Sequence, residues 1–453
     1  MSESQVKVNF FTKEEDESLR APEAPLFVPV SLKRYGLSEV VNHLLEREDP
    51  VPFDFLIDGV LLRTSLDEYL VKNGLSSEAF VLIEYARAVL PPSFLASFNN
   101  EDWISSVDTF SASSAGDRLQ DDSFSLPQIL VGSYDSIVRT YNMSGQVQQQ
   151  FAGHLAAVKA AKWVTNHRAV SGATDGQIRL WKTSASSKEE VGEEEEPESG
   201  KTLAILTGHN AAVVNLDTHA KTQRILSASH DNVVGVWSSV PKQMNVVDAM
   251  GEEATGAFAS LASKKRRKMA NRDSAVKHRA PLALLEGHMQ PVEDVCFDKT
   301  DSSVAYSVSQ DHTVKTWDLV TGRCVDTRST GYSLLSVLQL PEVHLIATGS
   351  SARHINLHDP RAQAGATEMS ISKLTGHTNF VVDLAACPTK PNIFASASHD
   401  GSVRIWDVRS EKSLYVIERE SGNGKVFGVA WDNDIGIVSG GEDKKLQINS
   451  NLN

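Results

Sequence analysis

The stretch "SHDGSVRIW", residues 398–406, decides the fold, because most of the chain repeats its form. Each copy has a small or polar turn, an aspartate and a strand of alternating apolar residues. The other copies are "SYDSIVRTY" (133–141), "ATDGQIRLW" (173–181), "SHDNVVGVW" (229–237), "SQDHTVKTW" (309–317) and "GEDKKLQIN" (441–449). A degenerate copy, "GSSARHINLHD" (349–359), places Ser351 where the aspartate would stand. Seven such units predict an all-β, seven-bladed propeller.

The spacing of the units points to four strands in each and to two insertions. From one aspartate position to the next, the gaps are 40, 56, 80, 40, 49 and 43 residues, whereas a four-stranded blade needs about 40 to 45. Residues 184–200 hold seven glutamates, and residues 239–280 hold a basic run. Both segments are poor in apolar clusters, so we expect disordered loops. Each follows a third strand and precedes a fourth, so both should leave the face opposite the aspartate-bearing turns.

Composition limits the class of protein. The chain has 453 residues and a formal net charge of -14, which argues against wholesale wrapping of nucleic acid. The three cysteines, at positions 296, 324 and 387, lack the spacing of a disulfide framework or a zinc site. A reducing compartment therefore fits best. We find neither a secretory signal pattern nor a run of eighteen apolar residues, so we expect no membrane segment.

Four units carry a Gly-His pair ahead of their strands, and here the chain resembles the WD-repeat family. In that family a histidine, a serine, the turn aspartate and a tryptophan form a buried hydrogen-bonded set. The matching sets are His154, Ser171, Asp175, Trp181; His209, Ser227, Asp231, Trp237; His288, Ser307, Asp311, Trp317; and His377, Ser396, Asp400, Trp406.

Each set contains Ser, His and Asp, which are also the ingredients of nucleophilic catalysis. Four repeated copies favour a structural role, since one active site needs one exposed nucleophile beside an oxyanion hole. Three more histidines, His344, His354 and His358, stand near the degenerate unit. Without carboxylates or cysteines at matching spacing, they are better interpreted as strand-edge residues than as metal ligands. We therefore predict no enzyme activity and no cofactor held by this chain alone.

The seventh unit lacks its outer strand, because only three residues follow "LQINS", residues 446–450. An open edge would invite aggregation, so an upstream segment should pair there. The alternating segment "EDWISSVDTF", residues 101–110, is the best candidate for this closing strand. We expect residues 93–124 to hold the linker and the closing strand, with a tether at 93–100, and residues 125–453 to form the propeller.

The first 92 residues lie outside the repeat and predict a small α+β domain. Strands are expected at "QVKVNFFT", "LFVPVSL", "PFDFLIDGVLL" and "AFVLIEYARAV", with an Asp58-Gly59 turn in the third. Helices are expected at "GLSEVVNHLLER", with Ser38 as N-cap, and at "SLDEYLVKNG", stopped by Gly74. This order is that of a ubiquitin-like (β-grasp) fold. The domain carries 9 Lys/Arg and 16 Asp/Glu, a balance of -7.

WD propellers commonly bind partners through the residue third after the Gly-His histidine and the residue before the turn aspartate. Apolar and aromatic groups at these positions suit a protein contact better than phosphate. The candidates are Tyr134, Ala157, Ala212, His230, Pro291, Phe380 and His399, with Thr174, Gln310 and Glu442 at the remaining positions.

Together with "SLKRYGLSEVVNHLL", "VPFDFLIDGVLLRTSL", "NGLSSEA" and "AVLPPSFLASFNNEDWISS", the two-domain arrangement resembles a family of WD-repeat ribosome-biogenesis factors over essentially the whole chain. Members act in the nucleolus and nucleoplasm on precursors of the large (60S) subunit. Their partners are pescadillo and a block-of-proliferation-type WD-repeat protein, in the PeBoW complex. The resemblance implies a non-catalytic role in pre-rRNA processing.

The resemblance also implies a role for one carboxylate. In the family, the ubiquitin-like domain is gripped by the metal-dependent adhesion (MIDAS) domain of the AAA ATPase midasin, through a single loop glutamate. The matching residue in "SSEA" is Glu78, and Glu84 is the runner-up. A hard carboxylate oxygen can fill the open site of a partner-held Mg²⁺. ATP-driven pulling on this handle would then extract the factors from the particle.

Two alternatives remain open at this point. WD propellers also serve as substrate receptors of ubiquitin ligases, and co-purified cullin subunits would favour that function. The basic run Lys264, Lys265, Arg266, Arg267 and Lys268 suits an import signal or an RNA contact. The alternative for those five residues is a merely solvated charge run.

Overall fold

The computed structural model describes residues 4–14, 16–22, 24–46, 49–75, 80–115, 126–183, 198–247, 276–361, 372–419 and 424–452. The chain divides into two compact units, one of Met1–Pro92 with Leu452–Asn453 and the other of Ser93–Asn451. Each unit is described by itself.

The N-terminal unit is a five-stranded mixed sheet with two α-helices and one 3₁₀ helix. Its strands are β1 (Gln5–Phe11), β2 (Leu26–Pro29), β3 (Phe53–Ile57), β4 (Val60–Leu61) and β5 (Phe80–Arg87); its helices are η1 (Glu17–Leu19), α1 (Arg34–Leu44) and α2 (Leu66–Lys72). The sheet order is β2-β1-β5-β3-β4, with β1 and β5 parallel. One buried face of the sheet packs with Leu37 and Val41 of α1 into a single core. This is the β-grasp arrangement that the sequence predicts.

Local sequence signals mark the start of one helix in this unit and misplace the start of the other. Ser65 caps α2, since its side chain accepts from Glu68 N at 3.3 Å. The prediction that Ser38 caps α1 is wrong, because the helix begins at Arg34 after Lys33. Ser38 is buried inside the helix, where its hydroxyl donates to Val51 O and accepts from Phe53 N. Its role is therefore to fasten the helix to the chain entering β3.

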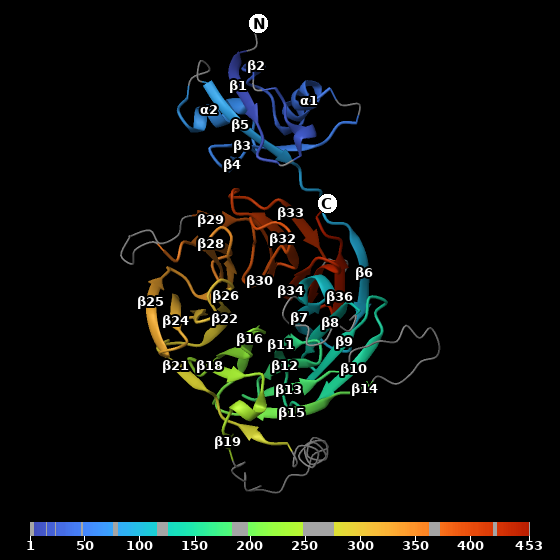
Figure 1. The fold of residues 1–453 in the computed structure, drawn as a ribbon, viewed down its shortest axis with the longest axis vertical. Helices are drawn as coiled ribbons and strands as arrows, with labels where there is room; N and C mark the ends of the chain where they lie inside the picture. The colour runs from blue at the N-terminus through green and yellow to red at the C-terminus, as the bar shows by residue number, and fades with distance from the viewer. Residues whose placement is uncertain are drawn as a thin grey trace. The chain divides into compact units, whose positions relative to one another are not determined.

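The second unit is a propeller of seven blades, which confirms the predicted fold class (Figure 1). The first four blades are β7 (Ile104–Phe110), β8 (Gln128–Ser133), β9 (Ile137–Tyr141), β10 (Val147–Ala152); β11 (Val158–Thr165), β12 (Arg168–Ala173), β13 (Ile178–Lys182), β15 (Lys201–Leu206); β16 (Val213–His219), β17 (Arg224–Ser229), β18 (Val233–Ser238), β21 (Ala283–Glu286); and β22 (Val292–Phe297), β23 (Val304–Ser309), β24 (Thr313–Asp318), β25 (Arg323–Ser329).

The remaining three blades follow in chain order until the ring closes. They are β26 (Leu334–Leu340), β27 (Leu345–Ser350), β28 (His354–His358), β29 (Ser372–Thr375); β30 (Val381–Ala386), β31 (Ile393–Ser398), β32 (Ser402–Asp407), β33 (Tyr415–Glu418); and β34 (Val426–Asp432), β35 (Gly436–Gly441), β36 (Lys445–Asn449), β6 (Phe94–Asn99). A short helix, α3 (Ala112–Ala115), follows β7. Apolar residues of neighbouring blades pack face to face, as in the cluster that joins Ile104 and Val131 to Val438 and Ile448.

The closing strand differs from the one that the sequence predicts. The outer strand of blade 7 is β6, whose register pairs Phe98 with Leu446 and Ser97 with Gln447. In Figure 1 this blue strand lies beside the red strand β36. Residues 101–110, predicted to close the ring, instead contain β7, the innermost strand of blade 1. The expected tether at 93–100 is therefore mostly β-strand, and the propeller begins at about residue 93 rather than 125.

The degenerate blade needs a smaller correction. Gly349 pairs with Ile355 across the β27–β28 turn, just as Gly132 pairs with Val138 in blade 1. Arg353, with a φ of 67°, therefore takes the place of Ser136, whose φ is 72°. The residue that replaces the aspartate is Ala352, one position after the predicted Ser351.

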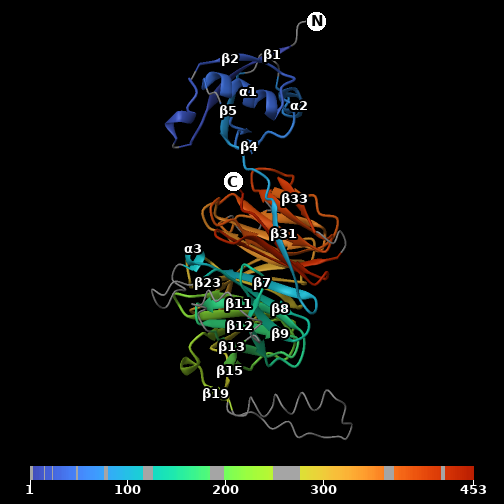
Figure 2. The same cartoon turned by 90° about the vertical axis from the view of Figure 1, so that its right-hand side faces the viewer.

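Both insertions have ends that are part of the fold, contrary to the prediction that they are disordered throughout. The acidic insertion ends in β14 (Glu198–Ser199), which pairs in parallel with β10 of blade 1. The basic insertion contains η3 (Pro241–Gln243), β19 (Val246–Val247) and β20 (His278–Arg279), and β20 pairs in parallel with β15 of blade 2. Figure 2 shows β11, β12, β13, β15 and β19 in order outward from the middle of the ring. Each insertion thus returns to the outer edge of the preceding blade. The central parts, residues 184–197 and 248–275, lie outside the described residues.

Candidate partner-binding site

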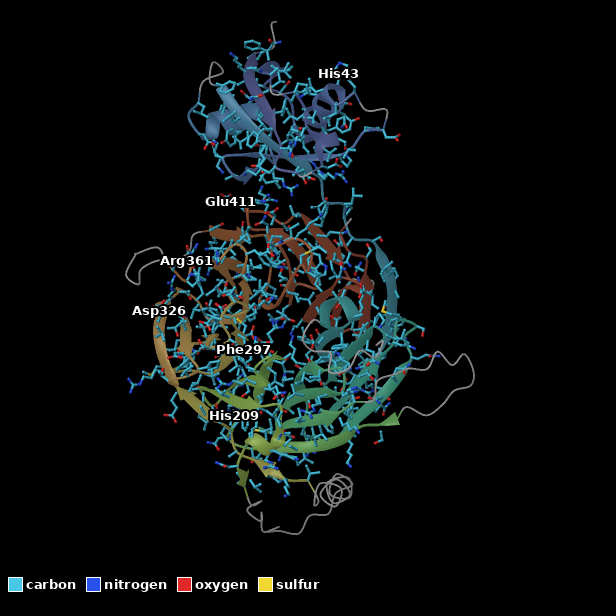
Figure 3. The ribbon with its side chains drawn as sticks, in the orientation of Figure 1. His43, His209, Phe297, Asp326, Arg361 and Glu411 are labelled. Carbon is cyan, nitrogen blue, oxygen red and sulfur yellow. The ribbon has the colours of Figure 1, made fainter. Side chains whose placement is uncertain are left out.

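The four predicted Ser-His-Asp-Trp sets form the same hydrogen-bonded network. In blade 6 the Trp406 indole donates to Ser396 Oγ at 2.7 Å, and that hydroxyl lies 2.7 Å from His377 Nε2. His377 Nδ1 lies 2.8 Å from an oxygen of Asp400. Figure 3 shows the side chains between the strands and labels His209 of the equivalent set in blade 3. The sets of His154 and His288 have the same pattern, with Nδ1 to aspartate distances of 3.2 and 2.8 Å.

Burial sets the pKa of three of these histidines, and a histidine partner sets the pKa of one aspartate. Burial lowers the pKa of His377 more than the neighbouring carboxylate raises it, so the ring is neutral at pH 7. The same balance lowers the pKa of His154 and of His288. Burial alone would raise the pKa of Asp231, but the hydrogen bond and charge of His209 outweigh it and hold that pKa at about 2. The four histidines are 1 to 9% exposed. Each set therefore ties the turn to the blade interior rather than presenting a nucleophile to substrate.

The three blades without the histidine use other residues in the same place, which sequence inspection missed. In blade 7, Arg419 donates to both carboxylate oxygens of Asp443, at 3.0 and 2.7 Å, and to Ser439. In blade 1, Asn100 donates to Ser133 Oγ and accepts from the Tyr141 hydroxyl. Spacing could not reveal these residues, since neither belongs to a Gly-His pair.

In blade 5 the serine and the tryptophan of the set have polar replacements. Thr348 and His358 take the places of the serine and tryptophan, with 3.0 Å between Oγ1 and Nε2. His354 instead bonds Ala352 O through Nδ1 and packs edge-on against Tyr332. The part of the chain that the structure describes holds no group of three or more His, Cys, Asp or Glu residues arranged to bind a metal ion.

An aromatic cluster runs across the aspartate-turn face, over blades 6, 7 and 1. Ring centroids are separated by 6.0 Å between Phe380 and His399, 5.4 Å between His399 and Phe427, 6.0 Å between Phe427 and Tyr134, and 5.5 Å between Tyr134 and Trp103. Three of the predicted positions, at residues 134, 380 and 399, thus come together. We call these five residues the aromatic cluster.

Two members of the cluster were not among the predicted positions. Trp103 directly precedes β7, the place that Phe380 holds before β30, but blade 1 has no Gly-His pair to mark it. Phe427 is the second residue of β34. Alignment of the innermost strands would have found Trp103 but not Phe427, which aligns with Val382 rather than with a predicted position.

The aromatic cluster is accessible and close to neutral. Phe380 is 43% and Trp103 is 37% exposed. Burial lowers the pKa of His399, so its ring adds no charge at neutral pH. Charged groups stand at its border, since Lys159 Nζ lies 4.3 Å from the Tyr134 ring centroid and donates to its hydroxyl, and Lys425 and Glu442 act on the His399 ring with opposite charge. Rigid aromatic rings around a desolvated centre are typical of protein-binding surfaces.

The other predicted face positions lie apart from this cluster. Ala157, Ala212 and Pro291 are half-buried beside innermost strands of blades 2 to 4, and His230 faces Glu293 at 3.5 Å. Gln310 donates to the same glutamate. This side of the face is polar, so the candidate site narrows to the aromatic cluster.

Two further predictions lie outside the described residues, namely Glu78 and the basic run Lys264 to Lys268. Cys296, Cys324 and Cys387 are free thiols. None of the helices in the described ranges combines the length and the apolar character needed to cross a membrane.

Comparison with known proteins accounts for both units. The family described as the NLE (NUC135) domain matches residues 6–70, and the WD domain, G-beta repeat family matches residues 145–182, 200–238, 279–318 and 368–407. The chain is 61% identical over 458 residues to the ribosome biogenesis protein YTM1 of Debaryomyces hansenii, covering 98% of this chain and 97% of that protein. The chain belongs to the YTM1 family of ribosome biogenesis proteins.

Other similarities agree with this family. The YTM1 protein of Candida glabrata is 54% identical over 463 residues, covering 99% of this chain and 98% of that protein. The solved WD40 β-propeller domain of Doa1 matches with a TM-score of 0.56 and 17% identity, over 80% of this chain and 97% of that domain. At that identity the likeness supports the fold alone. The four matched WD repeats are the Gly-His units, whereas the three other blades of this YTM1-family chain carry substitutes.

Proposed function

We propose that this member of a ribosome biogenesis family is a non-catalytic assembly factor of the 60S subunit, required for pre-rRNA processing in the nucleolus and nucleoplasm. Its propeller would bind partner assembly factors, namely pescadillo and a block-of-proliferation-type WD-repeat protein. Its N-terminal unit would be the handle through which midasin removes the factors from the pre-60S particle. The observation that carries this proposal is the pairing of an NLE-type unit with a WD propeller along nearly the full length of the YTM1 relatives.

The handle rests on the carboxylate of Glu78. The described residues offer no metal site of their own, so the proposal assigns Mg²⁺ to the partner's MIDAS domain, with this chain adding one oxygen. Glu78 precedes β5 by two positions. The runner-up, Glu84, lies within β5 and is held by Lys13 Nζ at 2.7 Å. That ion pair makes Glu84 the poorer ligand and a matched control.

Replacing Glu78 tests the handle. In Glu78→Ala we expect magnesium-dependent capture by the MIDAS domain to be lost, with binding at least a hundredfold weaker, because a metal ligand is removed. Glu84→Ala, which removes a carboxylate six positions away, should be captured as well as the wild type. A pull-down with and without Mg²⁺ measures both. Capture of Glu78→Ala equal to wild type would refute the assignment.

The propeller surface has its own test. Phe427→Ala should weaken binding to the block-of-proliferation-type protein by about 30-fold, since a central aromatic contact contributes about 2 kcal/mol. Tyr332→Ala removes a 45% exposed ring that precedes the innermost strand β26 of blade 5, away from the aromatic cluster. That control should bind as the wild type does in calorimetry. Equal weakening by the two variants would contradict the assignment of the aromatic cluster.

For the basic run, Lys264 to Lys268, we keep import-receptor or RNA contact as a proposal. Replacing the five residues by serine should reduce nuclear accumulation if import is the role, and should leave it unchanged if the run contacts RNA alone. Crosslinking to pre-rRNA separates the second outcome from a merely solvated run.

A further inference from the structure

A short stretch of chain connects Glu78, the residue on which the ATPase is proposed to pull, to β6, the strand that closes the propeller. Glu78 is followed by β5, and β5 leads through residues 88–93 into β6, the outer strand of blade 7. Any pull on Glu78 that is resisted at the propeller therefore passes along β5 and enters the propeller at Ser93. That a partner pulls on Glu78 rests on the proposed function. The path from β5 to β6 is a feature of the structure and does not depend on it.

Strand β5 is built to transmit tension without unfolding its unit. It is the central strand of the sheet, bonded to β1 on one side and β3 on the other, and Val81, Ile83 and Tyr85 are buried. A β-strand is already nearly fully extended, so a pull on its two ends is borne by the covalent backbone. The bonds to β1 and β3 carry little of that load.

Strand β6 has the opposite character. Among the strands that the structure describes, its hydrogen-bonded neighbour is β36 alone, and its first two residues, Phe94 and Leu95, are 51 and 56% exposed. The first hydrogen bonds that a pull at Ser93 would strain are Ser450 N to Ser93 O, at 2.7 Å, and Ser93 N to Ser450 Oγ, at 2.8 Å. These bonds are solvent-accessible, and a pull at Ser93 reaches the pairs of the β6–β36 ladder from that end.

The chain at the C-terminal end of β6 is held by several buried hydrogen bonds. Asn100 is 8% exposed, its backbone N–H donates to Lys444 O at 2.7 Å, and its amide bonds both Ser133 and Tyr141 in blade 1. Three residues later the chain reaches Trp103 of the aromatic cluster. The cluster spans the same junction, with Trp103 and Tyr134 in blade 1 and Phe427 in blade 7.

The junction of blades 7 and 1 is tied differently from four of the others. In blades 1, 3, 4 and 6 an aspartate of the innermost strand accepts a backbone N–H of the next blade; the pairs are Asp108 with Trp163, Asp217 with Phe297, Asp294 with Val337, and Asp383 with Val429. At the junction of blades 7 and 1, the described residues show instead side-chain bonds from Ser111 to Asp432 at 3.0 Å and from Ser113 to Asp434 at 2.6 Å.

We propose that the β6–β36 pairing is a load-sensitive closure of the propeller. Tension entering at Ser93 peels β6 from β36 as far as Asn100 and leaves blade 7 with three strands. The peel stops at Asn100, ahead of the aromatic cluster, so the propeller keeps its partner bound while the N-terminal unit is pulled.

Single-molecule stretching of the full chain tests the first step. Handles are attached through Glu78→Cys and through the native, exposed thiol of Cys324 on β25, with Cys296 and Cys387 replaced by alanine. We expect the first event to lengthen the tether by at most about 30 Å, the extended length of residues 93–100 at about 3.5 Å per residue. A first event of several hundred ångströms, from unfolding of the N-terminal unit or of a whole blade, would overturn the proposal.

A disulfide staple supplies the matched comparison. Ser97→Cys with Gln447→Cys joins paired residues of β6 and β36, whereas Arg404→Cys with Val416→Cys joins paired residues of the outer ladder of blade 6, away from the load path. The closed β6–β36 staple should remove at least half of the first step, and reductant should restore it. The blade 6 staple should change nothing. An unchanged first step in the oxidised β6–β36 variant contradicts the proposal.

Partner retention under load separates this inference from the proposed function. With the fluorescent block-of-proliferation-type protein bound, load that completes the first step should leave its dissociation rate within about twofold of the unloaded rate. Dissociation at least tenfold faster would show that the opening reaches the aromatic cluster and would contradict the proposal. If Glu78→Ala is still captured by the MIDAS domain, the proposed function fails while the stretching result stands. If capture requires Glu78 but the staple leaves the first step unchanged, the closure fails and the handle stands.

Discussion

Blade 6 and blade 7 are neighbours with the same strand order, yet they fasten their aspartate turns differently. Blade 6 uses neutral His377 between Asp400 and Ser396, with Trp406 behind. Blade 7 uses the permanent cation of Arg419 on Asp443 and Ser439. The same turn can therefore be held by a neutral network or by a buried ion pair. Breaking the two networks should therefore lower the free energy of unfolding of the propeller by different amounts and change its pH dependence differently.

The largest effect is expected in blade 7. Arg419→Ala removes the cation that pairs with the buried carboxylate of Asp443, which should cost about 3–5 kcal/mol of propeller stability. The two side chains are 2 and 6% exposed. All seven tryptophans lie in the propeller, so their fluorescence in a urea titration reports on this unit alone. Arg361→Ala breaks an exposed pair with Asp359 and should leave the midpoint nearly unchanged. Equal shifts for both variants would contradict the comparison.

A smaller effect with a pH signature is expected in blade 6. His377→Asn should cost about 1–3 kcal/mol, because the hydrogen bonds of a buried network are lost. Burial lowers the pKa of His377 in the folded state, so the unfolded chain binds the proton first. The stability contributed by the neutral ring is present above about pH 6.5 and is lost as pH falls below that value.

The variant should therefore be less sensitive to acid than the wild type between pH 7 and 5, in the same fluorescence titration. Arg419→Ala, which removes a group that stays charged, should keep the acid sensitivity of the wild type over this range. A steeper loss of stability in His377→Asn than in the wild type would argue against a neutral buried ring.

The smallest effect is expected in the degenerate blade 5. There one bond joins Thr348 Oγ1 to His358 Nε2 at 3.0 Å. Thr348→Val keeps the shape and removes that bond together with a long one of 3.5 Å to Asn356 O, so we expect a loss of about 1 kcal/mol. Ser396→Ala in blade 6 removes two short bonds of 2.7 Å and should cost more. Thermal melting followed by fluorescence ranks the two variants, and a reversed ranking would contradict the view that blade 5 is held mainly by packing.

The sequence predicted the repeated parts of the fold well, because turn aspartates and Gly-His pairs recur at a fixed distance from their strands. It failed at the closure, since both candidate segments contain apolar residues at strand spacing. Residues 104–110 are mostly buried, as an innermost strand must be, whereas 94–99 are exposed or half-buried, as an outer strand can be. Burial distinguishes the two, and alternation does not.

The candidate site was predicted only in part for a related reason. Tyr134, Phe380 and His399 follow from family spacing, but their meeting with Phe427 and Trp103 depends on the ring closing between residues more than 300 positions apart. Ser38 was misassigned because Val51 and Phe53, its real partners, are remote in sequence from the helix start. Tertiary contacts of this kind leave no local pattern.

The short strands β14 and β20 have a practical consequence for shortened versions of this protein. Each covers the outer edge of a blade with a parallel pair, Gln149 with Glu198 on β10 and Ile205 with His278 on β15. Excising residues 184–200 and 239–280 whole would leave two bare sheet edges, which are templates for self-association. Excision limited to 184–197 and 248–275 keeps both covers, so the trimmed protein should stay monomeric at concentrations where the fully excised one precipitates.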